Sequence, residues 1–450
     1  MRIPTAFVLV LVASRAVSAQ DVAVRLDSAM RVAEREGFSG VVRIERAGTT
    51  LLDKGYGLAN RATRTPFTAA TVVQIGSNTK DFTAVAILQL LEAGKLKLTD
   101  SLVKYFPAAP SDKRAITISQ LLDHTAGFRQ DMGGDFAPFS RSMLIDSALK
   151  SRLLSEPGQR ESYSNTGFSL LAAIIEQVSG TTYDIYVRDH ILAPLGLHKT
   201  GFLLPGFSMA ELAHGYAGNG NDEGVMLAKP HAADGPYWNL RGNGGMLSTA
   251  GEMHAFYAAL FESEKLMSAR TRALRFHVNE PIGLAGSDGV NVFYFGRFPG
   301  ARTEVIVAST NAAVKAPRIR QALEKILGLQ GDDEPDGPRQ GGVAAPAAIA
   351  LVLEQFVRAV NSGNAADLRT FITDHFATDP DSPPLEDRVT RFSGMHGNLG
   401  TLTVVKAEVF PEGPAELTLK SATKGAVVVK AVIDRAAPHR IHAMQVLLGG

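Results

Sequence analysis

Residues 71–94 read TVVQIGSNTKDFTAVAILQLLEAG, and this stretch decides the fold prediction. It opens with a strand-like run, Thr71–Gly76, which leads into a helix from Ser77 to about Ala93. The helix is apolar nearly all round, so we expect it to be buried in the core. Gly94 then follows as a helix C-cap residue. A strand, a tight turn and a buried helix therefore place Ser77 at a helix N-terminus.

Ser77 and Lys80 form an S-x-x-K pair at this turn. A spacing of three puts both side chains on one helix face, with Cβ atoms about 5–6 Å apart. A serine hydroxyl needs a base to become a nucleophile, and a lysine sheltered from water loses its proton easily enough to serve. The helix N-terminus adds a backbone N–H for a developing oxyanion. Alone, S-x-x-K is a weak signal, because an exposed helix start also explains a single copy.

A second polar group, Tyr163-Ser164-Asn165, lies 86 residues after Ser77, just before an expected helix at 166–178. A tyrosine near a lysine ammonium can ionise or share its proton, which gives a second acid/base group. Asn165 is expected to hold the lysine or a substrate amide through its side chain. The alternative is an ordinary helix N-cap made by Ser164 or Asn165.

The segments from about Phe38 to Asn311 resemble the serine β-lactamase and penicillin-binding protein superfamily, in particular its class C-like branch, which also holds esterases and D-amino-acid peptidases. Besides the two motifs, the resemblance rests on four further segments in the family's order. They are QLLEAGKL (89–96), LLDHTAG (121–127), PLGL (194–197) and GGMLSTA (244–250). The resemblance implies an acyl-enzyme mechanism in which Ser77 attacks a carbonyl and Lys80 with Tyr163 shuttles protons. It leaves open which of the two is the base, and His124 in the second segment is interpreted as structural.

The family's third motif is a Lys or His, a small residue and a Gly on an inner strand that faces the serine. Lys199-Thr200-Gly201 spells it, but precedes the 244–250 segment, which the third motif should follow. By position, the motif is Leu284-Ala285-Gly286-Ser287, just ahead of a strand at 290–298. Leu284 replaces the cation that would bind a substrate carboxylate. Gly286 is retained, so we expect the strand to approach the substrate closely. The Ser287 backbone N–H is expected to complete an oxyanion hole with that of Ser77.

The order of elements predicts an α/β fold. A hairpin of strands at 40–46 and 50–57, joined by Ala47-Gly48, precedes a long helical middle. Strands at 290–298 and 303–310 and a helix at 318–327 follow it. We expect an antiparallel sheet built from both ends of this segment, flanked by helices, with a helical subdomain inserted.

The predicted domains are a signal peptide at 1–19, the hydrolase domain at 20–330, a Pro/Gly-rich linker at 331–346 and an α+β domain at 347–450. The last domain resembles the NTF2-like fold, with two helices at 349–361 and 365–376. Four alternating strands follow them, at 402–410, 415–422, 426–433 and 439–448. This domain is expected to bind a ligand, to pair with a copy of itself or to shield the cleft.

Composition narrows the function. A net charge of +1 gives no argument for a nucleic-acid partner, and the absence of cysteine excludes disulfides and thiolate metal sites. The basic start and the apolar run at 6–13 predict a signal peptide cleaved near Ala19, and hence a periplasmic or secreted protein. No later segment is apolar and long enough to predict a membrane span. The 11 histidines show no metal-ligand spacing, so neither metal nor cofactor is expected.

Two functions remain in view. The first is a serine hydrolase acting on an ester or amide of a small molecule or peptide. Without a basic residue at position 284, it should favour substrates that need no carboxylate contact over β-lactam antibiotics. The second is a non-catalytic ligand-binding homologue that has lost turnover together with that residue. A scaffold role through the C-terminal domain has little support in the sequence.

Overall fold

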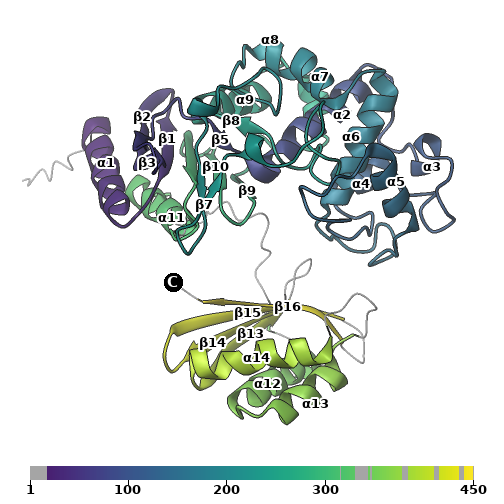
Figure 1. Cartoon of the computed structure of the whole chain (residues 1–450), viewed down its shortest axis with the longest axis vertical. Helices are drawn as coiled ribbons and strands as arrows, with labels where there is room; N and C mark the ends of the chain where they lie inside the picture. Colours follow the sequence, from purple (N-terminus) through teal and green to yellow (C-terminus); the bar gives the residue numbers. More distant parts are fainter. Residues whose placement is uncertain are drawn as a thin grey trace, which may run out of the picture. The chain divides into compact units, whose positions relative to one another are not determined.

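A computed structural model describes residues 18–314, 316–329, 343–344, 347–377, 384–409, 415–434 and 440–448. The chain divides into two compact units, Met1–Pro335 and Asp336–Gly450 (Figure 1). Apart from Ser18 and Ala19, the predicted signal peptide lies outside the described residues. Nearly all of the predicted linker also lies outside them.

The first unit is built on a five-stranded antiparallel sheet in the order β2-β1-β11-β10-β9. Its strands are β1 (Gly40–Arg46), β2 (Thr49–Tyr56), β9 (Ile282–Ser287), β10 (Val292–Phe298) and β11 (Thr303–Ser309). Strand β1 pairs with β11 from Gly40 opposite Ser309 to Arg46 opposite Thr303. The prediction of a sheet assembled from both ends of the segment is therefore confirmed.

The β1–β2 hairpin turns at Ala47 and Gly48, whose φ values of 52° and 77° are both left-handed. Two successive left-handed residues match the twist of a two-residue hairpin connection, and glycine adopts this conformation at no steric cost. The Ala-Gly signal in the sequence therefore has a direct structural counterpart.

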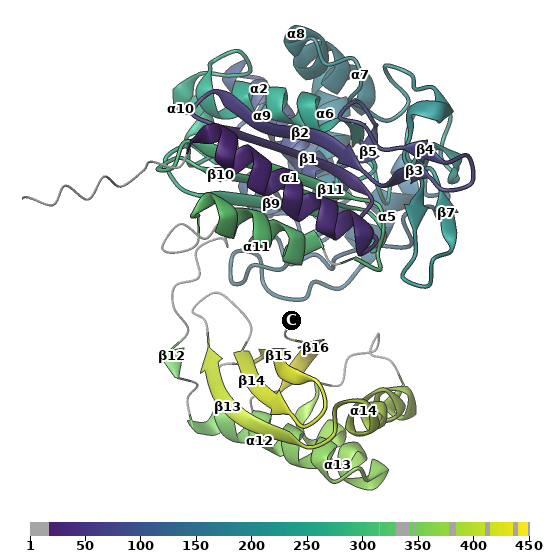
Figure 2. The ribbon, with the colours of Figure 1, turned by 90° about the vertical axis from the view of Figure 1, so that its left-hand side faces the viewer.

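Helices cover both faces of this sheet. Figure 2 shows α1 (Ala19–Arg35) and α11 (Ala316–Leu327) lying across one face. There, Val42 and Val307 pack into an apolar cluster with these two helices. Neighbouring residues in a strand point to opposite faces, so Val41 and Ala308 join the main core instead. That core contains α2 (Thr79–Glu92), α6 (Asn165–Ser179) and α9 (Ala250–Glu262).

Between β2 and β9 the chain forms the predicted helical subdomain and a series of short elements. The further helices are α3 (Leu102–Tyr105), α4 (Ile118–Leu122), α5 (Arg141–Lys150), α7 (Tyr183–Val187), η2 (Arg188–Leu192), α8 (Ala193–Leu195), η3 (Met209–Glu211), η4 (Met226–Ala228) and α10 (Ala269–Arg272). The short strands are β3 (Leu58–Asn60), β4 (Thr65–Pro66), β5 (Val73–Gln74), β6 (Gly215–Tyr216), β7 (Asp222–Gly224) and β8 (Leu247–Ser248).

The stretch that decided the fold prediction differs from the expectation in two details. Of the predicted strand, Val73–Gln74 (β5) pairs with β8, and Val72 forms an isolated β-bridge with Leu212. Ser77 lies in a single 3-10 turn, η1 (Gly76–Asn78), directly before α2. The buried helix itself is confirmed, because ten of its residues are buried.

The described residues of the second unit form three helices and an antiparallel sheet in the order β12-β13-β14-β15-β16. Its elements are α12 (Ala347–Asn361), α13 (Ala365–His375), α14 (Leu385–Leu399), β12 (Val343–Ala344), β13 (Leu402–Val409), β14 (Ala415–Ser421), β15 (Gly425–Ile433) and β16 (Ile441–Leu448). Both predicted helices are confirmed as α12 and α13, and the sequence analysis missed a third, α14. Gly394 and Gly397 lower its intrinsic helix propensity, and packing of Phe392 on Phe356 offsets this. The NTF2-like assignment stays a prediction.

Among the described residues, none of the helices combines the length and apolar character needed to cross a membrane.

Candidate active site

Strand β9 approaches the turn at Ser77 so closely that only glycine fits at position 286. A Cβ atom built on Gly286 lies 2.1 Å from the carbonyl oxygen of Ile75 and 2.6 Å from the backbone nitrogen of Ser77. Both neighbours are backbone atoms, which cannot rotate away as a side chain would. Gly286 therefore sets the distance between β9 and η1. Its predicted role in close approach to the substrate stays a prediction.

Gly286→Ala is expected to push β9 away from Ser77. We expect a reduction in any activity of the site and a loss of about 1–3 kcal/mol in unfolding free energy, since overpacking shifts the backbone. Gly134→Ala is the matched control, because nothing lies within 4 Å of a Cβ built there. Thermal and urea unfolding of both variants provide the measurement. Equal stabilities would contradict the assigned role of Gly286.

The structure brings Ser77, Lys80 and Tyr163 together. The Ser77 Oγ lies 2.6 Å from the Tyr163 hydroxyl oxygen and 3.1 Å from Lys80 Nζ. Tyr163 stands just before α6, where the Ser164 Oγ caps the helix by accepting a hydrogen bond from the Gly167 N–H at 3.1 Å. The N-cap and acid/base interpretations of this segment are therefore compatible, because neighbouring residues perform the two tasks.

Lys80 is only 7% exposed and is enclosed by polar and aromatic partners. Its Nζ donates to the carbonyl oxygen of Asn243 at 2.7 Å and lies 4.8 Å from the ring centre of Tyr163. Burial lowers the pKa of Lys80 to about 7, against the opposing influence of nearby carboxylates, first that of Asp131. An amine with this pKa is partly unprotonated at neutral pH and can accept a proton.

Tyr163 has the opposite protonation tendency. Burial of its hydroxyl raises the pKa of Tyr163 above the usual 10, while the hydrogen bond with Ser77 acts in the other direction. The phenol is therefore protonated at neutral pH and is able to donate a hydrogen bond or a proton. The two groups beside Ser77 Oγ thus differ in role, with Lys80 the better acceptor and Tyr163 the better donor.

Asn165 does not hold the lysine as expected. Its Nδ2 donates instead to Asp131 Oδ1 at 2.7 Å. Its Oδ1 is buried and accepts no hydrogen bond from the described residues. The first alternative, a contact with the lysine, failed because Asp131 lies in a loop 34 residues earlier, and no local pattern links the two. The second, binding of a substrate amide, stays a prediction. For a substrate amide, Asn165 still offers its carbonyl oxygen and the second N–H of Nδ2.

The degenerate third motif lies just ahead of β10, as predicted, and itself forms strand β9. Residues two apart in a strand share a face, so Leu284 lies on the same face as Gly286. Leu284 is partly buried against the main core, opposite Phe295 in β10. The Ser287 nitrogen is near the turn, since a Cβ atom built on Gly76 would lie 2.7 Å from it. The backbone of Ser287 thus reaches the neighbourhood of Ser77.

Lys199-Thr200-Gly201, which matches the third motif letter by letter, has a structural role. The Lys199 Nζ forms a 2.6 Å ion pair with Glu211, and the Thr200 Oγ1 donates to Glu252 at 2.6 Å. The Lys199 backbone N–H also binds the Glu252 carboxylate at 2.8 Å. The bonds to Glu252 fix the segment to the start of α9, and the ion pair with Glu211 fixes it to η3. This structural role agrees with excluding the segment as the third motif.

A chain of buried hydrogen bonds supports the turn that carries Ser77. Asn78 Nδ2 donates to the Tyr257 hydroxyl at 2.8 Å, and this hydroxyl donates to Asp81 Oδ2 at 2.8 Å. Burial raises the pKa of Asp81 to about 6.

Sequence reasoning missed both Tyr257 and Asn243. For Asn243 the signal lay beside a recognised segment, in the Gly-Asn-Gly-Gly run that starts at Gly242.

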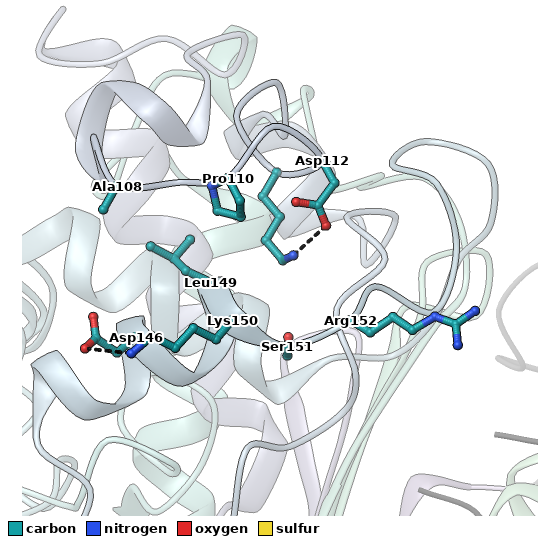
Figure 3. Close-up of a pocket in the computed structure, with 9 residues that line it drawn as sticks. Ala108, Pro110, Asp112, Asp146, Leu149, Lys150, Ser151 and Arg152 are labelled. Atoms are coloured by element: carbon teal, nitrogen blue, oxygen red, sulfur yellow. Dashed lines mark hydrogen bonds and ion pairs between the residues drawn. The ribbon is translucent and has the colours of Figure 1, made fainter. Parts of the chain in front are cut away.

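A pocket of about 500 Å³ lies between the α3–α4 connection and the end of α5 (Figure 3). Both of its lysines already have acidic partners, Lys113 with Asp112 at 2.6 Å and Lys150 with Asp146 at 3.7 Å. None of the predicted site residues lines it. Among the described residues, no group of three or more His, Asp or Glu side chains is placed to hold a metal ion.

The chain is similar in sequence and fold to several known proteins. The chain is 33% identical over 235 residues to PbpX of Bacillus subtilis (strain 168), covering 52% of this chain and 58% of that protein. It is 27% identical over 252 residues to penicillin-binding protein 4* of the same organism, covering 52% and 55%. The chain thus spans a little over half the length of these curated relatives. A crystal structure of a penicillin-binding protein from Bacillus halodurans superposes with a TM-score of 0.57 at 25% identity, covering 67% of this chain and 99% of that one. The family model described as Beta-lactamase matches residues 26–292, and the chain belongs to this family of β-lactamase-fold proteins.

Proposed function

We propose that this protein is a serine hydrolase that cleaves an ester or amide through an acyl-enzyme formed on Ser77. The observation that carries the proposal is the position of Ser77 Oγ, within hydrogen-bond distance of both Lys80 Nζ and the Tyr163 hydroxyl. A nucleophile, a base and a donor within reach of each other are the requirement for nucleophilic catalysis.

In the proposed acylation, neutral Lys80 takes the proton of Ser77 while Oγ bonds to the substrate carbonyl carbon. The carbonyl oxygen becomes an oxyanion, for which the backbone N–H groups of Ser77 and Ser287 are the proposed donors. Tyr163 then gives its proton to the leaving group as the bond to that group breaks, and recovers one from Lys80. Water hydrolyses the ester on Ser77 by the same proton transfers in reverse order.

The pH dependence follows from the lowered pKa of Lys80, about 7. Below this pH the amine is protonated and cannot accept the Ser77 proton, so kcat/KM for a neutral ester should rise with pH through about 7. It should then stay level until Tyr163 ionises, at a pH above its usual range. Steady-state rates of p-nitrophenyl butyrate hydrolysis between pH 5 and 9 test this. A rate that is flat from pH 5 to 8 would argue against Lys80 as the base.

The proposed substrate has no carboxylate next to the reacting carbonyl. Leu284 offers no charge on the strand that faces the turn, and the carboxylates of Asp131 and Asp135 lie near enough to influence Lys80. An anionic substrate would meet these negative charges, and Leu284 supplies no cation to offset them. We therefore propose small neutral esters or peptides as substrates, in preference to β-lactams.

Leu284→Lys should restore the missing cation. We expect the ratio of kcat/KM for a carboxylate-bearing ester to that for its neutral methyl ester to rise about tenfold, which corresponds to about 1.4 kcal/mol. Leu284→Met is the control of similar shape without charge. Rates for the matched pair of esters with both variants provide the test, and an unchanged ratio would show that position 284 does not face the substrate.

The second candidate, a binder without turnover, is favoured by the same Leu284. It predicts equal affinity of a ligand for the wild type and for Ser77→Ala, and no covalent adduct with either. Labelling with a fluorophosphonate probe separates the two candidates, since only the hydrolase is labelled, and only when Ser77 is present. We further propose that the protein acts after export, on the basis of the N-terminal residues 1–19 alone.

A further inference from the structure

His124 holds an unusual backbone position directly after α4. Its φ of 57° is left-handed, a conformation that glycine adopts freely and other residues adopt at a cost of about 1–2 kcal/mol. Two backbone bonds close the helix around it, from the Thr125 N–H to the Gln120 carbonyl oxygen at 2.9 Å and from the His124 N–H to that of Leu121 at 3.5 Å. This is the Schellman arrangement, whose left-handed residue is usually glycine. The backbone at position 124 therefore favours glycine, yet the residue there carries a large side chain.

That side chain reaches the segment that carries Tyr163. His124 Nδ1 accepts a hydrogen bond from the Ser164 N–H at 3.0 Å. The His124 carbonyl oxygen accepts a second from the Ser162 N–H at 2.7 Å. The two bonds hold the residues on either side of Tyr163, and so they restrain its backbone from both ends.

The ring of His124 also packs against the tyrosine itself. Its centre lies 4.8 Å from that of Tyr163 and 5.1 Å from that of Phe168. Burial lowers the pKa of His124 to about 4, with the charge of Lys80 acting in the same direction. The imidazole is thus neutral at working pH, and a neutral ring is required for Nδ1 to accept the Ser164 N–H.

We propose that His124 is a positioning residue, which holds the Tyr163 hydroxyl at hydrogen-bond distance from Ser77 Oγ through its Nδ1 acceptor and its ring. The proposal rests on the proposed hydrolase function and deepens it. His124 touches neither Ser77 nor the reacting atoms in this account. Its effect should therefore appear in the rate of the chemical step and not in substrate binding.

Three variants separate the contributions of the Nδ1 acceptor, the ring and the left-handed backbone of His124. His124→Asn keeps an acceptor, because Asn Oδ1 occupies about the place of His Nδ1, and asparagine tolerates the left-handed backbone. His124→Phe keeps a ring and removes the acceptor. His124→Gly removes both and relaxes the backbone.

For p-nitrophenyl butyrate hydrolysis, we expect kcat of the Gly and Phe variants to fall about 10- to 100-fold while KM stays within about twofold, since a misplaced catalytic group costs rates of this order. His124→Asn should recover most of kcat. A Gly variant with wild-type kcat, or an Asn variant as slow as the Gly variant, would overturn the proposal. Comparison of Asn with Phe keeps the test decisive where the Gly variant fails to fold.

Hydrogen exchange gives a readout that does not depend on turnover. The Ser164 amide should exchange more slowly in the wild type and the Asn variant than in the Phe and Gly variants. Equal exchange in all four proteins would overturn the proposal, whatever the activity. Absence of ester turnover and of Ser77 labelling in the wild type would instead overturn the proposed function, so the two failures are distinguishable.

Discussion

Ser77→Ala is expected to abolish ester turnover, with a fall in kcat of about 10⁴-fold or more, as for removal of the nucleophile in other serine hydrolases. The substitution removes only the Oγ that Lys80 and Tyr163 share. Because Ser77 is not part of the closely packed core, the variant should fold normally. Steady-state kinetics and a thermal melt of the same preparation provide the measurement.

Ser147→Ala is the matched control for this experiment. Ser147 is a half-buried serine in α5, outside the proposed site. Its variant should keep full activity. Residual turnover of Ser77→Ala at the wild-type rate would show that another group is the nucleophile, and it would remove the basis of the mechanism.

Lys80→Met should combine a large loss of activity with a gain in stability. Methionine is of similar length and apolar, so it fills the buried site without a charge. We expect kcat/KM to fall about 10²- to 10⁴-fold, the usual effect of removing a positioned base. The Asn243 carbonyl oxygen loses its donor, at a cost of about 1–3 kcal/mol. The energetic cost of burying an ammonium exceeds this.

The gain in stability should depend on pH. The folded-state pKa of Lys80 is about 7, against 10.5 for an ordinary lysine. Below pH 7 the folded protein contains a buried ammonium, and this penalty is relieved as the pH rises from 7 to about 10.5. Lys80→Met should therefore raise the melting temperature most at pH 6 and least at pH 9. A variant less stable than the wild type at pH 6 would contradict the assigned burial cost.

The local features of the site could be predicted from sequence. Ser77 and Lys80 lie one helical turn apart, so their proximity follows from helix geometry alone. Tyr163 and Gly286 were located by the order of recurrent segments. The hairpin and the central sheet were predictable because alternating apolar residues and the turn at Ala47-Gly48 specify strands and their connection.

The remaining features depend on contacts that leave no local pattern. The carbonyl oxygen of Asn243 binds Lys80 across 163 residues of sequence, and any residue type supplies a carbonyl. The same reason explains the failed expectation for Asn165, whose partner Asp131 lies in an irregular loop. The sequence assigned His124 a structural role but not its contact with the Tyr163 segment. Its left-handed backbone and its bond to Ser164 become visible only in three dimensions.

The most direct test of the account is to look for the acyl-enzyme. Wild-type protein mixed with p-nitrophenyl butyrate and quenched in acid during turnover should gain the mass of one butyryl group. Fragmentation should place this group on Ser77, and Ser77→Ala should gain no mass under the same conditions. A wild-type protein that hydrolyses the ester but carries the acyl group on another residue, or that shows neither hydrolysis nor an adduct, would contradict the central claim.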